Sequence, residues 1–189
     1  MKISNIKYYD GARDKICRLG LTDSFLEIQE ALLGTDISLE ERRRADNAGV
    51  ICEVLDAAFE EATGWTQIRA GGINWSGQRS DNVNFISKIG VEIQVSARSD
   101  LLIRDIVHLR NSLQEGSIDV GVIVVPDDRM QRFLPDRTPA FRDAIRYIEK
   151  EFKEATTFPI VIVAVEHDNP GRALAKKKRK LEAAEPEMN

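Results

Sequence analysis

Apolar residues follow two different spacings along this chain, and the spacings separate predicted helices from predicted strands. Apolar positions three or four residues apart predict helices over residues 24–33, over residues 39–63, in a segment beginning at Ser99 and in one beginning at Thr138-Pro139. Near-continuous apolar runs predict two strands buried on both faces, at residues 118–125 and 158–165. A further strand is predicted from residue 65 to 73, leading through a polar loop over residues 71–81.

Residues 82–96 (NVNFISKIGVEIQVS) predict an antiparallel hairpin with a turn at Ser87, Lys88 and Ile89. In that register Ile86 pairs with Gly90, Phe85 with Val91, Asn84 with Glu92 and Val83 with Ile93. Alternation then gives an apolar face made of Val83, Phe85, Val91, Ile93 and Val95. The opposite, polar face carries Asn82, Asn84, Glu92, Gln94 and Ser96.

The order of these elements is helix, three strands, helix, strand, helix, strand. It predicts an α/β fold in which helices flank a mixed β-sheet, with an antiparallel hairpin at one side and a parallel βαβ unit at the other. We expect a single domain over residues 1–167, with its core at about 38–165. The composition becomes polar after that, and residues 168–189, including the basic run at 176–180, are expected to form a loose tail.

Composition narrows the class of protein. The 189 residues are 42% hydrophobic, enough for a proper core, and 27 basic against 31 acidic residues give a net charge of −4. That balance argues against a nonspecific nucleic-acid coat protein, but it leaves room for a locally basic groove. Cys17 and Cys52 are far apart and lack zinc-site spacing, so we expect reduced thiols. Without a signal peptide or a membrane-length apolar run, a cytoplasmic protein is expected.

The polar face of the predicted hairpin has two interpretations. Glu92 and Gln94 could simply face solvent from an exposed strand. A functional role is favoured because the next helix crosses over to a buried parallel strand, which places the hairpin in the middle of the sheet. Glutamate is also depleted in strands, and the preceding loop is glycine-rich and polar, as loops that line clefts are.

With this element order, the Glu92-x-Gln94 pair resembles the PD-(D/E)xK nucleases, and more narrowly the type II restriction endonucleases of the BglII/BstYI kind, in which glutamine replaces the usual lysine. The resemblance covers residues 38–165. It implies a restriction-endonuclease-like αβββαβ core that hydrolyses duplex DNA at specific sites as a homodimer. It also suggests a target containing a central GATC.

The family places an aspartate on the strand before Glu-x-Gln, where it ligates the metal. This sequence has Asn84 at the matching position, and its nearest acid is Asp81. Either Asn84 replaces a native aspartate and leaves a poorly active or inactive form, or Asp81 enters the site. The first is favoured, because alternation puts residue 84 on the face of Glu92 and would put Asp81 on the apolar face.

The resemblance implies a catalytic set of Asn84, Glu92 and Gln94 with Mg²⁺ as cofactor. The metal would be held by residue 84 (as the native Asp), Glu92 and the backbone carbonyl of Ile93, with Asp81 as the alternative ligand. Mg²⁺ prefers such oxygen ligands and would lower the pKa of the attacking water. Glu92 would bind the nucleophile, and Gln94 would orient it.

Contacts with double-stranded DNA are predicted in two segments. Ser96, Arg98 and Ser99 follow the catalytic strand at a helix N-terminus, a site suited to anions or base edges, although Ser99 also suits a plain N-cap. The second segment follows a buried strand and could equally be a solvated loop; its candidates are Asp127, Asp128, Arg129 and Arg132. Lys176 to Lys180 could contact phosphates or stay solvated. His108 and His167 have no partner at ligand spacing and are assigned no role.

Two other classes remain open. One is a non-cleaving DNA- or protein-binding module with a nuclease-like fold, which a natural Asn84 would suit. The other is a different nuclease of the same fold, such as a repair enzyme or a junction resolvase. If the protein is a homodimer, the helices at 24–33 and 39–63 are the candidate dimer surface.

Overall fold

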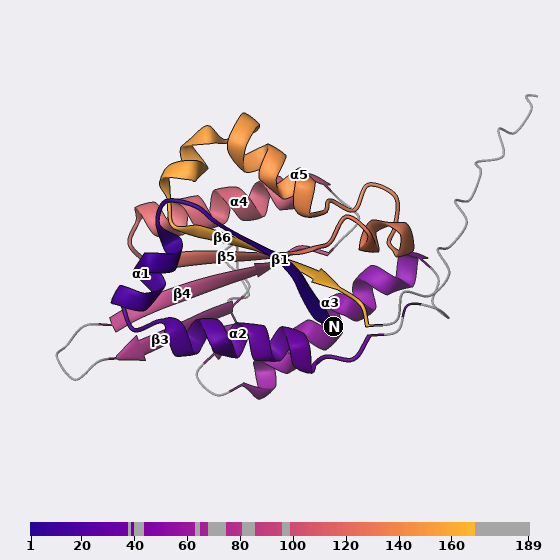
Figure 1. Ribbon diagram of the computed structural model, residues 1–189, viewed down its shortest axis with the longest axis horizontal. Helices are drawn as coiled ribbons and strands as arrows, with labels where there is room; N and C mark the ends of the chain where they lie inside the picture. Colours follow the sequence, from indigo (N-terminus) through magenta and orange to yellow (C-terminus); the bar gives the residue numbers. More distant parts are fainter. Residues whose placement is uncertain are drawn as a thin grey trace, which may run out of the picture.

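The computed structural model describes residues 1–37, 39, 44–62, 65–67, 75–80, 86–95 and 99–168. In Figure 1 these residues form a central twisted sheet with helices on both faces. The six strands lie in the order β1-β6-β5-β4-β3-β2. Their bounds are Lys2–Tyr8 for β1, Trp65–Gln67 for β2, Trp75–Ser80 for β3, Ile86–Ile93 for β4, Val120–Pro126 for β5 and Ile160–Glu166 for β6.

The sheet is mixed, as the element order predicts. β4, β5 and β6 are parallel, and each pair is joined by a helical crossover. β2 and β3 extend the β4 side as antiparallel strands, whereas β1 pairs antiparallel with β6 at the other edge. β4 therefore lies inside the sheet between β3 and β5, which confirms the predicted mid-sheet position of Glu92.

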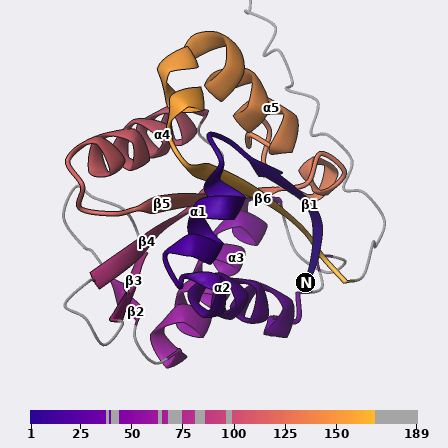
Figure 2. The ribbon, with the colours of Figure 1, turned by 60° about the vertical axis from the view of Figure 1, so that its left-hand side comes forward.

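Two helical layers cover the sheet, and Figures 1 and 2 show them on opposite faces. One layer consists of α1 (Ala12–Arg18), α2 (Thr22–Gly34) and α3 (Arg44–Glu61). The other consists of α4 (Ser99–Gln114) and α5 (Phe141–Arg146), which continues through a π-helical turn η2 (Tyr147–Glu151). Two 3-10 turns, η1 (Met130–Phe133) and η3 (Lys153–Thr157), complete the helical elements of the described residues.

Each face of the sheet has its own apolar core. Alternate valines of β5 point to opposite sides: Val122 packs in the cluster under α1–α3, and Val125 in the cluster under α4 and α5. The predicted apolar face of β4 is confirmed, because Val91, Ile93 and Val95 all lie in the cluster under α1–α3. The other face of β4 therefore points toward α4.

Helix α4 packs closely on the sheet above β5. Leu102, Ile106 and Leu109 are buried, as the predicted stripe requires. Gly121 of β5 lies directly below the helix, and a Cβ added there would be 3.2 Å from Leu109 Cδ2. A Cβ at Gly121 would therefore make a tight contact, and the Leu109 side chain would have to shift by a few tenths of an ångström.

The predicted hairpin register is wrong. Residues 87–89 do not turn; they lie inside β4, where Ser87, Lys88 and Ile89 pair with Arg79, Gln78 and Gly77 of β3. The strand partner of β4 is thus residues 75–80, which the sequence analysis placed in a loop. The physical reason is Trp75, which is buried, stacks on Phe59 with ring centroids 5.6 Å apart and donates a hydrogen bond to Asp56. The residues predicted to form the first hairpin strand, 82–85, lie outside the described part.

The remaining elements agree with the predictions apart from their ends. The helix predicted at 24–33 is α2, and the one predicted at 39–63 is α3, which begins at Arg44. The helix predicted from Thr138-Pro139 begins at Phe141. β1 and α1 were missed. Apolar alternation in β1 is interrupted by a register shift between Ile3 and Asn5, and this shift hides the strand in the sequence.

Two general features of the described part complete the fold. Cys17 and Cys52 are both free thiols. Among the described helices, none combines the length and the apolar character needed to span a bilayer.

Candidate active site

The face of β4 that points toward α4 carries the predicted Glu-x-Gln pair. Glu92 lies in β4, and Gln94 directly follows this strand, with its backbone N–H donating to the carbonyl of Val124 in β5. The two residues are two positions apart, so their side chains emerge on the same side. They are only 2% and 3% exposed, respectively. The structure therefore excludes the interpretation in which these polar residues simply face solvent from an exposed strand.

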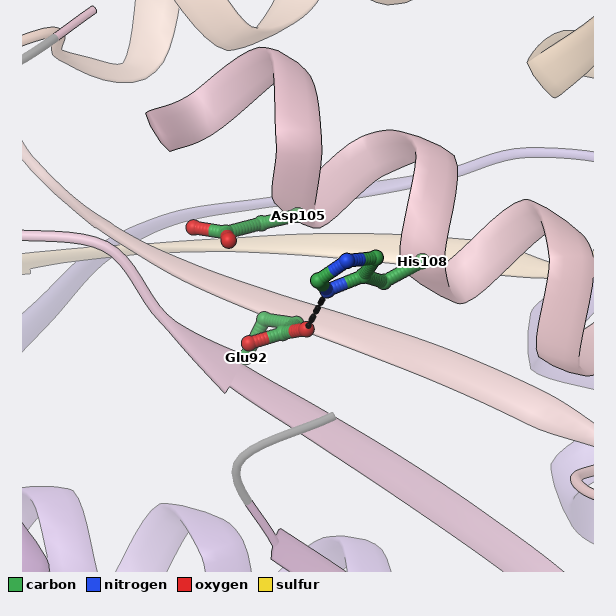
Figure 3. Close-up of side chains that lie close together, drawn as sticks. All are labelled: Glu92, Asp105 and His108. Atoms are coloured by element: carbon green, nitrogen blue, oxygen red, sulfur yellow. Dashed lines mark ion pairs between the residues drawn. The ribbon is translucent and has the colours of Figure 1, made fainter. Parts of the chain in front are cut away.

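Helix α4 brings two further ligand-type side chains to Glu92. Asp105 and His108 are three residues apart, so both project from the same face of the helix, toward the sheet. Figure 3 shows both above the Glu92 carboxylate, with a dashed line joining His108 to Glu92. His108 Nδ1 lies 3.4 Å from Glu92 Oε1, and one ligand atom from each of the three residues falls within 4.8 Å of the others.

Burial sets the electrostatics of this cluster. Asp105 is 3% exposed, and this burial raises the pKa of its carboxyl to about 6, although Arg104 acts to lower it. Burial lowers the pKa of His108, and the positive charge of Arg104 lowers it further. His108 is therefore neutral at physiological pH, and its contact with Glu92 is not an ion pair there.

Neutral imidazole and buried carboxylates are the donor types that bind divalent cations in proteins. Nδ1 of His108 makes no hydrogen bond within the described part of the chain. Arg104, whose Nε is 3.5 Å from Asp105 Oδ1, is more than half exposed and so neutralises the two carboxylates only in part. A bound cation would balance this buried negative charge, and the donor set therefore fits a metal ion.

Of the other predicted metal ligands, one lies beside Glu92 and two lie outside the described residues. Ile93, whose carbonyl was a predicted ligand, lies in β4 next to Glu92. Asn84 and Asp81 lie outside the described residues, so their predicted roles stay predictions. The ends of the connection that contains them, Ser80 and Ile86, pair with each other at the start of β4, roughly 20 Å along the strand from Glu92.

Among the predicted DNA-contacting residues, Ser96 and Arg98 lie outside the described part, and Ser99 begins α4. Asp127 is buried at the carboxyl end of β5, where its carboxylate accepts hydrogen bonds from Ser4 Oγ (2.6 Å), Asn5 Nδ2 (3.3 Å) and the Arg129 backbone N–H (2.9 Å). Burial would raise the pKa of this carboxyl, but these hydrogen bonds hold it below its usual range. Asp127 thus joins β1 to β5, and a contact with DNA stays a prediction for it.

The three remaining candidates follow Asp127 in the same loop. Asp128 accepts a hydrogen bond from the backbone N–H of Arg142 and pairs with its guanidinium at 3.0 Å. Arg129 and Arg132 are both exposed. This loop leaves β5 at the edge of the sheet where β4 also ends, because the two strands are parallel.

Sequence reasoning missed Asp105 and His108, and the assignment of no role to His108 needs correction. The available signal was the i,i+3 spacing of an acid and a histidine on a helix that directly follows the Glu-x-Gln strand. That spacing alone does not show which way the pair faces. It became informative once α4 was placed over β4.

Comparison with known families identifies the chain. The family model described as "Restriction endonuclease BglII/BglIII" matches residues 9–165, which is most of the 189 residues. No curated protein matches the sequence. The matched range includes the whole sheet except β1 and the end of β6, together with the Glu92 cluster. The chain therefore belongs to the BglII/BglIII family of restriction endonucleases, which hydrolyse phosphodiester bonds of DNA at specific sites.

Proposed function

We propose that this protein cleaves double-stranded DNA in the cytoplasm as a Mg²⁺-dependent homodimer, with Glu92 at the centre of the active site. One observation carries the proposal: the Glu-x-Gln pair lies on an interior strand, and its glutamate meets a second buried carboxylate, Asp105, and a neutral imidazole. Burying two carboxylates beneath a helix is unfavourable, so packing alone does not account for them. Cation-assisted phosphodiester hydrolysis, in contrast, uses buried carboxylates to hold the cation.

The ligands proposed for Mg²⁺ are the carboxylate of Glu92 and the backbone carbonyl of Ile93, two adjacent residues of β4. Both are oxygen donors, which Mg²⁺ requires. The cation would supply charge neutralisation at the phosphate and a lowered pKa for the attacking water.

The chain's own residues would position the nucleophile. The Glu92 carboxylate would accept a hydrogen bond from the attacking water and hold it in line with the scissile bond. Gln94, two residues after Glu92 and just past the end of β4, would orient that water from its neighbouring position. A glutamine can donate and accept hydrogen bonds without adding a charge, so it can do this without competing for the cation.

DNA would approach along the edge where β4 and β5 end. Arg129 and Arg132 follow β5 there and are exposed, so they are available to phosphates or to guanine edges. Ser96, Arg98 and Ser99, which come after β4 in the sequence, are proposed to contact the DNA together with Asp127 and Asp128.

The homodimer is proposed to form through α2. Leu26 and Leu33 of this helix are 48% and 51% exposed, and they are the only large hydrophobic side chains exposed to this degree among the described residues. They are seven residues apart, so they share one face of the helix. A second copy would cover this face and give the two-fold symmetry that suits a two-fold symmetric target.

Cleavage of one DNA of known sequence, followed by mapping of its ends, tests the function. We expect the protein or its Asn84→Asp variant to give discrete fragments with Mg²⁺, and Glu92→Gln to lower the cleavage rate by at least about a hundredfold, because a carboxylate at the cation site is lost. Arg129→Ala should weaken DNA binding, with a smaller loss in the rate at saturating DNA.

The outcome also separates the alternative functions. Discrete fragments indicate a sequence-specific endonuclease, whereas nicks or branch-specific cuts would indicate a repair nuclease or a resolvase. If neither form cleaves DNA and neither takes up a divalent cation in a calorimetric titration, the protein is a non-cleaving binding module and the proposal is wrong.

A further inference from the structure

The Glu92 site contains a nitrogen ligand that Mg²⁺ chemistry does not need. We infer that Asp105 and His108 of α4 complete the cation site in place of the aspartate that residue 84 lacks, and that the site therefore selects Mn²⁺ or Co²⁺ over Mg²⁺. The inference deepens the proposed function and rests on it for the use of the cation in DNA cleavage. The cation site itself is defined by the protein alone.

Geometry is the first support. The three ligand atoms lie within 4.8 Å of one another, and opposite ligands of a small divalent cation are on the order of 4 Å apart. Small side-chain rotations would bring the three ligand atoms from their present separation to the separation that a bound cation requires. The ligands come from two elements that are rigidly packed, since Leu102, Ile106 and Leu109 hold α4 against the sheet.

Charge is the second support. A glutamate and an aspartate, each no more than 3% exposed, meet at one point beside the imidazole of His108. Arg104 reaches one of the two carboxylates from an exposed position. Buried carboxylates are unfavourable unless a positive charge compensates them, and a divalent cation has the charge that balances two carboxylates.

Ligand chemistry then sets which cation is favoured. Mg²⁺ prefers oxygen ligands and keeps several waters, whereas imidazole suits Mn²⁺ and, more strongly, Co²⁺ and the later metals of the first transition row. Two carboxylates and one imidazole leave coordination positions open for a water and a phosphate oxygen. The site therefore has the composition of a catalytic cation site that uses a transition metal.

This arrangement explains how the site could work with asparagine at position 84. With an amide at residue 84, the predicted site keeps only the Glu92 carboxylate. Asp105 supplies the second negative charge beside Glu92. On this account Asn84 is a natural residue of an active enzyme, and the unmodified sequence binds its metal without an aspartate there.

Metal binding without DNA tests the inference. Mn²⁺ would be titrated into the full chain at pH 7.5 and followed by calorimetry, and Co²⁺ by its visible absorption. We expect one site per chain with higher affinity for Mn²⁺ than for Mg²⁺. His108→Gln should lower the Mn²⁺ affinity by roughly ten- to a hundredfold and reduce the preference over Mg²⁺, and Asp105→Asn should lower the affinity for both cations.

The matched control is His167→Gln, since His167 is the only other histidine of the chain and is not part of the cluster. It should leave Mn²⁺ binding unchanged. Unchanged binding in His108→Gln, or Mn²⁺ binding that appears only in Asn84→Asp, would overturn the inference.

If His108→Gln fails to fold, Zn²⁺ titration of the unmodified protein gives the same decision. In nitrogen NMR spectra, the imidazole signals of His108 should shift on Zn²⁺ addition while those of His167 stay in place. The opposite pattern, or no shift, would overturn the inference. DNA cleavage is measured separately. Metal binding at His108 without cleavage would contradict the proposed function alone, and cleavage without such binding would contradict the inference alone.

Discussion

Asp105 is a residue whose burial works against the stability of the protein. In the folded chain its pKa is raised to about 6, above the ordinary value of 3.8 that applies when the chain is unfolded. Below pH 4 the carboxyl is protonated in both states and the difference has no effect. Between pH 4 and 6 the unfolded state loses the proton first, so the free energy of unfolding falls as pH rises and stays lowered above pH 6.

Replacement of Asp105 by Asn should therefore stabilise the metal-free protein at neutral pH. We expect a gain on the order of 1–3 kcal/mol in the free energy of unfolding at pH 7.5, and little gain at pH 4. Urea unfolding of both forms in the presence of a chelator measures this. A gain that is the same at both pH values would show that the carboxylate is not destabilised by burial.

The same residue illustrates a conflict between stability and function. A carboxylate that is unfavourable in the metal-free protein becomes favourable when a cation binds beside it. Added Mn²⁺ should therefore raise the unfolding temperature of the unmodified protein more than that of Asp105→Asn.

At the scale of elements, the contact between α4 and β5 positions the site. Asp105 and His108 reach Glu92 only because α4 lies close to the sheet, and that approach depends on the absence of a side chain at Gly121. Leu109 is the helix residue that would meet a Cβ at this position.

Gly121→Ala should push α4 outward by a few tenths of an ångström and lower the free energy of unfolding by about 1–3 kcal/mol. It should also weaken Mn²⁺ binding, since two ligands move with the helix. Gly34→Ala is the control, because a Cβ there meets nothing within 4 Å. Chemical unfolding and metal titration of both variants measure the effects.

A double variant tests whether the effect of Gly121→Ala comes from its contact with Leu109 or from the substitution itself. Leu109→Ala alone opens a cavity and should lower the free energy of unfolding by about 2–5 kcal/mol. Combined with Gly121→Ala, it should lower stability by less than the sum of the two, because the added methyl group enters the vacated space. Strict additivity would contradict the proposed contact.

At the scale of the whole molecule, the two helical layers cover opposite faces of the sheet and would have different roles. The layer of α4 and α5 covers the face of the sheet toward which Glu92 points, and α4 contributes Asp105 and His108 there. The layer of α1–α3 covers the other face and exposes Leu26 and Leu33 on α2. A dimer formed through α2 would use the helical layer opposite α4, the helix that lies over Glu92.

Replacement of Leu26 and Leu33 together by Glu should convert the dimer into a monomer, because like charges would meet across a two-fold axis where apolar side chains were buried. Sedimentation equilibrium measures the mass. Lys150→Glu, an exposed charge change on the opposite layer, is the control and should leave the dimer intact. A dimeric double variant would place the interface elsewhere, and a monomeric unmodified protein would contradict the proposed dimer.

Much of this molecule is determined by sequence pattern alone. Buried strands at 118–125 and 158–165 and the stripe of α4 are recognisable because each segment is long and its spacing is unambiguous. The same is true of Glu92 and Gln94, since alternation with Val91, Ile93 and Val95 requires them to share the opposite face.

Tertiary structure decided the rest, because it depends on contacts between segments far apart in sequence. Trp75 belongs to a strand because Phe59 and Asp56 of α3 hold it, and no local pattern shows that contact. β1 is a strand because β6 offers it an edge, despite the interrupted alternation near Ile3. Asp105 and His108 meet Glu92 only through the placement of α4 over β4. Local spacing fixes which side chains share a face, whereas packing between elements fixes what that face meets.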